Sequence, residues 1–186
     1  MPLTDLSKPN GKPNMGGTFT KAYVFEIEDL DLTALPELSA LSKLDVIDDI
    51  VFKAAKKMAQ VYCTPTKGKL DGNTVGEING LSNENIVEIF YPGKEQTCAE
   101  WKAYMLNRAV GLIVPDTNGN NRLVGICSLN PDTVELSVEL PAYLTGASTS
   151  GGAACADLAG TTFTFSAPAR HDALYYKGAL TLVGGV

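Results

Sequence analysis

The sequence predicts a mainly β (α+β) domain, a two-sheet β-sandwich or barrel-like body with one flanking helix at about 97–109. Strand candidates dominate the chain, only one segment carries a secure helix signal, and turn signals recur roughly every ten residues. The clearest order lies between Glu88 and Cys127, which reads as strand, turn, helix, strand, tight polar turn and strand. We expect one domain over residues 19–186, preceded by a flexible N-terminal arm over residues 1–18.

Composition is that of an ordinary globular protein. The chain has 186 residues, of which 45% are hydrophobic and 19% charged, so one domain with a full core is expected. No run approaches the ~20 apolar residues that span a bilayer, and the N-terminus lacks the apolar stretch of a secretory signal. We therefore expect no membrane partner, and a protein that stays in the compartment where it is made. The net charge of −6 argues against a general nucleic-acid-binding surface, which needs clustered Lys and Arg.

The arm is predicted from its prolines and glycines, which prevent a helix or a central strand. Two readings of it stay open: a disordered terminus, or a segment that becomes ordered on a neighbouring subunit. The residues concerned are Pro2, Pro9, Pro13, Gly11, Gly16 and Gly17, with Lys8 and Lys12 among them.

Strands are predicted where β-branched and aromatic residues gather between turn signals. The stretch Leu38–Met58 is ambiguous, because its apolar spacing approximates a helical stripe while Val46-Ile47 and Ile50–Phe52 also suit strands. Between two of the strands, Pro65–Gly72 reads as a loop whose strongest turn signal is Asp71-Gly72. The predicted strands are 18–27, 59–64, 74–78, 86–91, 112–114, 122–128, 134–140, 161–167 and 178–183.

The helix is predicted from its start and from its apolar face. Thr97 and Glu100 have the spacing of a capping box, in which each side chain satisfies a free amide of the first turn. Trp101 and Met105 lie one turn apart on one face, so core packing is expected for Trp101. Lys102 and Arg108 are expected to point to water.

The four cysteines contain no Cys-x-x-Cys pair, so a zinc site or redox pair is poorly supported. Two disulfides are formally possible, but in a protein that stays in the cytosol buried reduced thiols are expected. The residues are Cys63, Cys98, Cys127 and Cys155.

Every motif that could carry chemistry fails a simple test. His171 is the only histidine and has no nucleophile signal nearby, so a surface or interface position is expected. The stretch 146–152 lacks the Lys of a phosphate loop and the spacing of a nucleophile elbow, and reads as a flexible connection. Asp116–Asn120 lacks the glycine and glutamate positions of a calcium loop and reads as a hairpin turn. Asp45, Asp48 and Asp49 read as a solvated face.

The sequence therefore predicts no catalytic, cofactor-binding or metal-binding residue. We expect no cofactor and no enzymatic activity.

The order of these signals resembles that of bacteriophage tail tube (major tail) proteins, over roughly residues 20–180. The matching pieces are Tyr91-Pro-Gly93 before the helix, Asn107 at its end, and the Asp116–Gly125 hairpin. Further along come Pro131, then Ala156–Phe165, then Leu174-Tyr-Tyr176. Turns and strands make up most of these pieces, so their order and spacing carry the resemblance.

The resemblance implies a β-sandwich with a flanking helix, of which six copies join sheet edges into a ring and rings stack into a tube. The expected partners are copies of the same chain, other tail proteins, and phage DNA that passes through the lumen without specific binding. The expected location is the virion tail, after synthesis in the host bacterial cytoplasm. The arm and the Pro65–Gly72 loop become candidates for contacts between rings. Two alternatives stay open: another virion component (adaptor, tail-completion or decoration protein), or a β-sandwich binding module.

Overall fold

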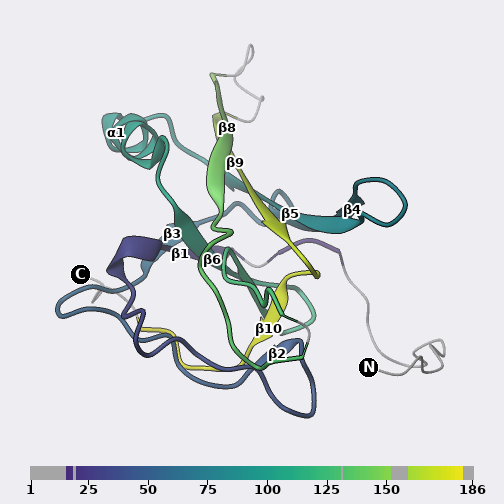
Figure 1. Cartoon of the computed structure of the whole chain (residues 1–186). Helices are drawn as coiled ribbons and strands as arrows, with labels where there is room; N and C mark the ends of the chain where they lie inside the picture. Colours follow the sequence, from purple (N-terminus) through teal and green to yellow (C-terminus); the bar gives the residue numbers. More distant parts are fainter. Residues whose placement is uncertain (1–15, 19, 131, 152–158, 182–186) are drawn as a thin grey trace.

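The structure is a computed structural model that describes residues 16–18, 20–130, 132–151 and 159–181. Two sheets pack face to face, which confirms the predicted mainly β two-sheet fold; the arrangement is sandwich-like and not a closed barrel (Figure 1). The six-stranded sheet has the order β2-β10-β7-β6-β1-β3, and the four-stranded sheet the order β4-β5-β9-β8. The elements are β1 (Lys21–Glu26), η1 (Ile27–Asp29), β2 (Asp45–Val46), β3 (Ala59–Tyr62), β4 (Lys69–Val75), β5 (Ser82–Tyr91), α1 (Gln96–Met105), β6 (Val110–Pro115), β7 (Asn121–Val124), β8 (Tyr143–Ser150), β9 (Gly160–Ala169) and β10 (Leu174–Tyr176).

The six-stranded sheet is buried on both faces. In β1, Ala22 and Val24 face a core shared with the four-stranded sheet, while Tyr23 and Phe25 face a second core. Irregular segments cover that second core, including residues 30–58 and 126–138. Because both faces are buried, β1 reads as an apolar run without polar alternation.

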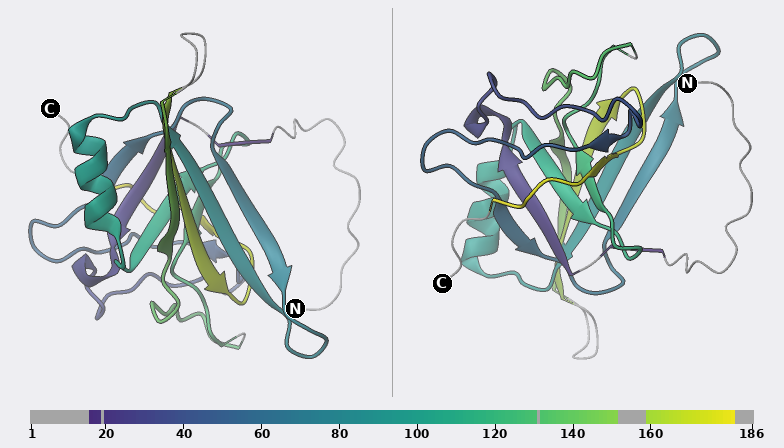
Figure 2. Two further views of the ribbon diagram at one scale, coloured as in Figure 1. Left: turned by 90° about the horizontal axis from the view of Figure 1, so that it is seen from above. Right: turned by 90° about the horizontal axis from the view of Figure 1, so that it is seen from below.

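The predicted strand-helix-strand-strand unit is present, as β5, α1, β6 and β7. It does not lie within one sheet, because β5 belongs to the four-stranded sheet and β6 and β7 to the six-stranded sheet. The helix therefore connects the two sheets along one side of the sandwich (Figure 2). Trp101 packs edge-on against Phe163 with ring centroids 4.8 Å apart, which confirms its packing role.

Two details of the helix prediction are wrong. The helix begins at Gln96 and ends at Met105, so Thr97 lies inside it and no capping box forms. Glu95 is the residue before the first turn, and Glu100 instead accepts a hydrogen bond from Gln96 Nε2 at 2.7 Å. The chain leaves the helical conformation at Leu106, whose backbone is extended, and Asn107 follows with a φ of 58°.

The segment Leu38–Met58 is neither a helix nor a long strand. Asp45–Val46 is its one strand, paired in parallel with β10; Leu38 and Phe52 form isolated bridges with Val46 and Leu30, and most of the remainder is irregular. Its buried side chains, Leu38, Val46, Ile50 and Met58, are spaced eight, four and eight residues apart and enter the second core. Phe52 is partly buried against the same core, whereas Leu41, Ile47 and Val51 are 95%, 51% and 42% exposed. The helix-like stripe in the sequence therefore does not correspond to a buried face.

The predicted loop at Pro65–Gly72 is present only over residues 65–68, and the predicted turn at Asp71-Gly72 is wrong, because β4 begins at Lys69 and contains both residues. A side chain at residue 72 would meet the Asp172 carboxylate, since an added Cβ would lie 1.9 Å from Asp172 Oδ1. Glycine there leaves room for the Asp172 carboxylate and does not form a turn. The real turn spans residues 76–81, where Gly76 and Asn79 have positive φ.

The remaining strand predictions differ in the C-terminal part. Residues 146–150, predicted as a flexible connection, belong to β8, and β10 lies at 174–176, ahead of the predicted strand at 178–183. Residues 134–140 form only one isolated bridge, between Ser137 and Cys127, and the described residues 178–181 are irregular. The predicted strand at 74–78 overlaps β4 only at residues 74–75, and the other predicted strands correspond to β1, β3, β5, β6, β7 and β9. The predicted arm lies almost wholly outside the described residues.

Candidate assembly surface

The four-stranded sheet ends in two strands that each have one open edge. β8 pairs only with β9, and β4 pairs only with β5, among the strands that the structure describes. Such an edge carries backbone N–H and C=O groups that another chain can pair with. The two edges lie on opposite sides of the sheet, so one molecule presents two different strands for pairing.

β8 lacks two of the devices that normally protect an open edge, charged side chains and prolines. Charged side chains and prolines on an edge strand hinder pairing with other chains. The strand has the sequence Tyr-Leu-Thr-Gly-Ala-Ser-Thr-Ser and contains neither. Its last residues, Ser148 to Ser150, are exposed. A register shift between Leu144 and Gly146 is the one irregularity in its pairing with β9.

β4 is unprotected over its second half. Its two charged residues, Lys69 and Asp71, lie in the first half, and Asn73, Thr74 and Val75 are exposed and uncharged. The hairpin that β4 forms with β5 projects from the body on the side opposite α1 (Figure 1). Near its tip, Val75, Ile78 and Leu81 are 37%, 87% and 62% exposed. The hairpin therefore combines an open edge with an apolar tip.

The face of the four-stranded sheet that points away from the core, here called the outer face, is acidic and rich in hydroxyl groups. Side chains alternate along a strand, and Val87, Ile89, Phe163 and Phe165 enter the core, so their neighbours lie on the outer face. The pairing register places on this face every charged residue of the sheet, and these are Lys69 and Asp71 of β4 and Glu84 and Glu88 of β5. Three carboxylates against one ammonium group leave a net charge of −2. Between them lie the hydroxyl groups of Thr162, Thr164, Ser166 and Ser148.

Contacts on the outer face are internal to the sheet. Lys69 forms ion pairs with Asp71 at 3.1 Å and with Glu88 at 3.0 Å. Glu84 accepts a hydrogen bond from the Ser166 hydroxyl at 2.5 Å. The single ammonium group is therefore shared between two carboxylates, and a phosphate would find no spare cation on these strands.

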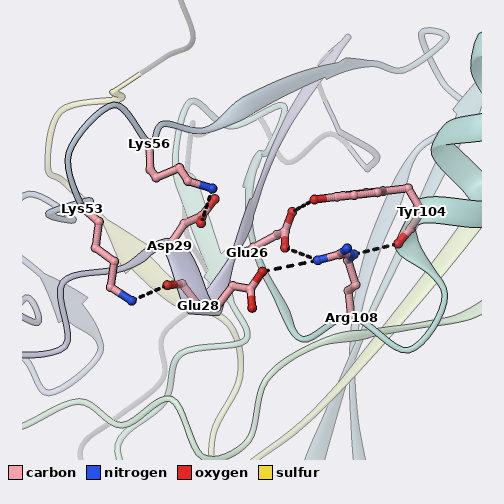
Figure 3. A network of polar contacts seen from close by, with 7 residues as sticks. All are labelled: Glu26, Glu28, Asp29, Lys53, Lys56, Tyr104 and Arg108. Carbon is pink, nitrogen blue, oxygen red and sulfur yellow. Dashed lines mark hydrogen bonds and ion pairs between the residues drawn. The ribbon is translucent and has the colours of Figure 1, made fainter.

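A polar network joins the end of β1 to the end of α1 (Figure 3). Arg108 Nη1 lies 2.7 Å from Glu26 Oε2 and 3.3 Å from Glu28 Oε1, and the guanidinium group also stacks over the Tyr104 ring. The Tyr104 hydroxyl donates to Glu26 Oε1 at 2.5 Å. Beside these groups, Lys56 pairs with Asp29 at 2.8 Å and Lys53 Nζ donates to the Glu28 carbonyl at 2.6 Å. The prediction that Arg108 points freely to water is therefore wrong.

The network carries a structural role. Burial raises the pKa of Glu26, but the hydrogen bonds from Tyr104 and Arg108 and the charge of Arg108 outweigh it and lower the pKa overall. A carboxyl group held in its ionised form by fixed partners ties the helix to the sheet and is not poised to transfer a proton.

The residues singled out from the sequence do not come together. His171 Nε2 accepts from the Ser128 amide at 3.1 Å, while its own carbonyl accepts from Asn85 Nδ2 at 3.2 Å, so it fastens the turn after β9 to two other segments. Asp45 pairs with Lys177, Asp48 accepts from the Glu37 amide, and Asp49 from the Ala179 amide. Asp45 and Asp49 thus hold the segment that follows β10, and Asp48 holds the backbone at Glu37, so the three carboxylates have structural partners and do not converge on one site.

The Asp116 stretch is the predicted hairpin turn. The Asp116 carboxylate accepts hydrogen bonds from the amides of Asn118 and Asn120, each at 2.9 Å, and the chain passes from β6 to β7. Among the described residues no group of His, Cys, Asp and Glu could hold a metal ion.

Three cysteines, Cys63, Cys98 and Cys127, are buried free thiols, and Cys155 lies outside the described residues. Burial raises the pKa of the Cys63 and Cys127 thiols, which keeps them protonated. They pack as small apolar groups.

The main surface missed in the sequence is β8. Its glycine and its serines suggested a flexible segment, whereas Tyr143, Thr145 and Thr149 are typical strand residues that could have indicated it.

No helix in the described part of the chain is long and apolar enough to cross a membrane. No protein-family model, curated protein or solved structure matches the chain.

Proposed function

We propose that the protein is a structural virion protein, a self-assembling subunit of a phage tail tube that serves as the conduit for DNA ejection. Six copies form a ring and rings stack into a tube. The observation that supports this most directly is the pair of open edges, β4 and β8, on opposite sides of one sheet. Pairing β8 of one copy with β4 of the next is a head-to-tail contact, and such a contact gives a closed ring when the rotation between copies closes.

Strand direction supports this pairing. The four strands alternate in direction, so β4 and β8 run opposite to each other. In a ring every copy has the same orientation along the ring axis, and β8 therefore meets the next copy's β4 antiparallel. The junction continues the pattern within the subunit and satisfies the backbone groups of both edges.

The outer face supplies the lumen in this arrangement. Joined edges make one continuous sheet around the ring, with all its outer faces on the same side. A lumen lined with hydroxyl groups and a net excess of carboxylates does not bind phosphates, because binding requires clustered cations that release counterions. DNA then passes through without being held.

The apolar hairpin tip supplies the axial contact. Exposed apolar side chains gathered at one projecting tip mark a surface that another protein covers. We assign Val75, Ile78 and Leu81 to the contact between successive rings. This role replaces the one expected for Pro65–Gly72, whose second half is part of the β4 edge.

Two single substitutions test the ring contact. Ser148→Lys places a charge on the β8 edge, and Asn73→Lys places one on the β4 edge; both residues are exposed, so the fold should be kept. Analytical ultracentrifugation and electron microscopy should show rings or tubes for the unaltered chain and monomers for each variant. Ala54→Lys, at an exposed loop residue, is the matched control and should assemble normally.

Mixing the two variants gives a stricter test. Asn73→Lys retains an intact β8 edge and Ser148→Lys an intact β4 edge, so an equal mixture should form dimers and nothing larger. If Asn73→Lys dimerised alone, β8 would pair with β8 and the ring proposal would be wrong. Rings of the unaltered chain that never stack would favour an adaptor or decoration protein instead.

A further inference from the structure

The edge of the other sheet formed by β3 is also open, and it borders a groove. β3 pairs with β1 and with no second strand among those described. The Cys63 amide donates to the Thr20 carbonyl at 2.8 Å, toward β1, whereas the Thr64 amide donates to the Phe90 carbonyl at 2.9 Å, on the opposite side. Because backbone groups alternate in an antiparallel ladder, Gln60 and Tyr62 direct their N–H and C=O groups away from β1.

The groove lies between β3 and α1 and has a volume of about 230 Å³. Aromatic and apolar side chains form most of its walls, and these are Val61, Tyr62, Tyr91, Cys98, Trp101 and Phe163. An open strand edge beside an apolar pocket is the arrangement in which proteins bind an extended peptide, with main-chain pairing for affinity and a pocket for one side chain.

The first described residues of the chain lie near the end of β3, on the side of β1, where Thr18 also forms a bridge with Asp116. The Thr18 hydroxyl is hydrogen-bonded to the Cys63 thiol, directly after β3, and Gly17 lies against the Gly68 carbonyl. The preceding residues 1–15 can span about 50 Å when extended, at about 3.3 Å per residue, and so can reach any part of the groove.

The chemistry of residues 1–15 suits an extended apolar site. Pro2, Pro9 and Pro13 favour extended backbone before docking, which lowers the entropy cost of binding. Leu3 and Leu6 are apolar side chains that the groove could take. Lys8 and Lys12 are opposite in charge to Glu95, whose carboxylate accepts a hydrogen bond at 3.3 Å from the hydroxyl group of Tyr91, a residue of the groove wall.

We infer that residues 1–15 dock along the open edge of β3 in their own molecule, pair with the backbone of Gln60 and Tyr62, and place an apolar side chain in the groove beside Trp101. This closes the third open edge of the molecule without a second copy. It is independent of the ring contact, which uses the edges of the other sheet.

Trp101 is the only tryptophan of the chain, so its fluorescence reports on the groove. The test uses the full chain carrying Asn73→Lys and Ser148→Lys, which keeps ring contacts out of the measurement. Deletion of residues 2–15 should shift the Trp101 emission to longer wavelength and raise its quenching by acrylamide. A peptide of residues 1–15 should reverse both changes with saturation, and a scrambled peptide should not.

Gln60→Pro provides a second variant in the full-length chain. Its amide points away from β1, so proline removes only the outward donor and should leave the circular dichroism spectrum unchanged. It should reproduce the fluorescence of the deletion. Equal quenching of the full-length and deleted chains would overturn the inference. Quenching of the full-length chain that rises on dilution would also overturn it, since the segment would then come from a second copy.

Discussion

Glu26 is the residue on which the contact between helix and sheet depends most. It receives the Tyr104 hydroxyl on one oxygen and the Arg108 guanidinium group on the other, and its side chain is only 14% exposed. Since two segments distant in sequence meet on one carboxylate, its ionisation is coupled to the folded state.

The pH dependence of stability should follow the pKa of Glu26. Burial raises this pKa, but the hydrogen bonds and the charge of Arg108 lower it overall from its ordinary value of 4.5. A pKa lowered on folding stabilises the fold fully above the unfolded value, and this contribution is lost as pH falls through the folded value. Urea unfolding at pH 7 and at acid pH should therefore show that acid lowers the unfolding free energy less for Glu26→Gln than for the unaltered chain.

Asp31→Asn is the control. The side-chain and backbone hydrogen bonds with Thr33 lower the pKa of Asp31 too, but both lie within one exposed turn. Equal acid sensitivity of Glu26→Gln and the unaltered chain would contradict the assignment.

Strand β4 depends on the absence of a side chain at Gly72. An added Cβ would lie 1.9 Å from Oδ1 of the exposed Asp172 side chain, which would have to turn away, so Gly72→Ala should destabilise the protein by about 1 kcal/mol, the low end of the cost of overpacking. Asp172→Ala should recover part of this loss in a double-mutant cycle measured by urea unfolding. Gly146→Ala in β8 is the matched control, because its Cβ would meet Thr164 at an ordinary 3.5 Å. Equal cost at the two glycines would contradict the packing argument.

The apolar tip of the β4–β5 hairpin should affect assembly without affecting the fold. Replacing Val75, Ile78 and Leu81 by Ser removes apolar groups that are already exposed, so the unfolding free energy should change by about 0.5 kcal/mol or less per site. Under the proposed function, electron microscopy should show rings that no longer stack. Leu41→Ser, at a residue 95% exposed elsewhere on the molecule, should leave tubes intact. Tubes formed by the triple variant would remove the hairpin from the axial contact.

The sequence predicted correctly those elements that depend on residues close together in the chain. The Asp116–Asn120 turn and the strand-helix-strand-strand order are confirmed, because turn chemistry and hydrophobic spacing act over a few residues. The prediction of a turn at Gly72 was wrong because the glycine makes room for Asp172, which lies a hundred residues away in sequence. The structure of the stretch Leu38–Met58 could not be predicted because its buried residues pack into a core formed by strands that are distant in sequence. The open edges could not be predicted, because the order of the strands in each sheet determines which strands lie at an edge, and local sequence signals do not determine that order.

The whole molecule distributes its charge so that one sheet face carries every charged residue of four strands. If this outer face lines a lumen, reversing its charge should create DNA binding. Glu84→Lys with Glu88→Lys converts a net charge of −2 into +2 per subunit, and a ring multiplies that field. The unaltered assembly should show no retention of DNA by filter binding. The double variant should retain DNA with an affinity that falls steeply with salt, as expected for phosphate contacts.

Asp48→Lys with Asp49→Lys makes the same charge change on the loop that follows β2, away from the outer face, and should bind DNA less well when assembled. Equal binding by the two double variants would mean that total charge, and not the outer face, decides the interaction, and the lumen assignment would fail.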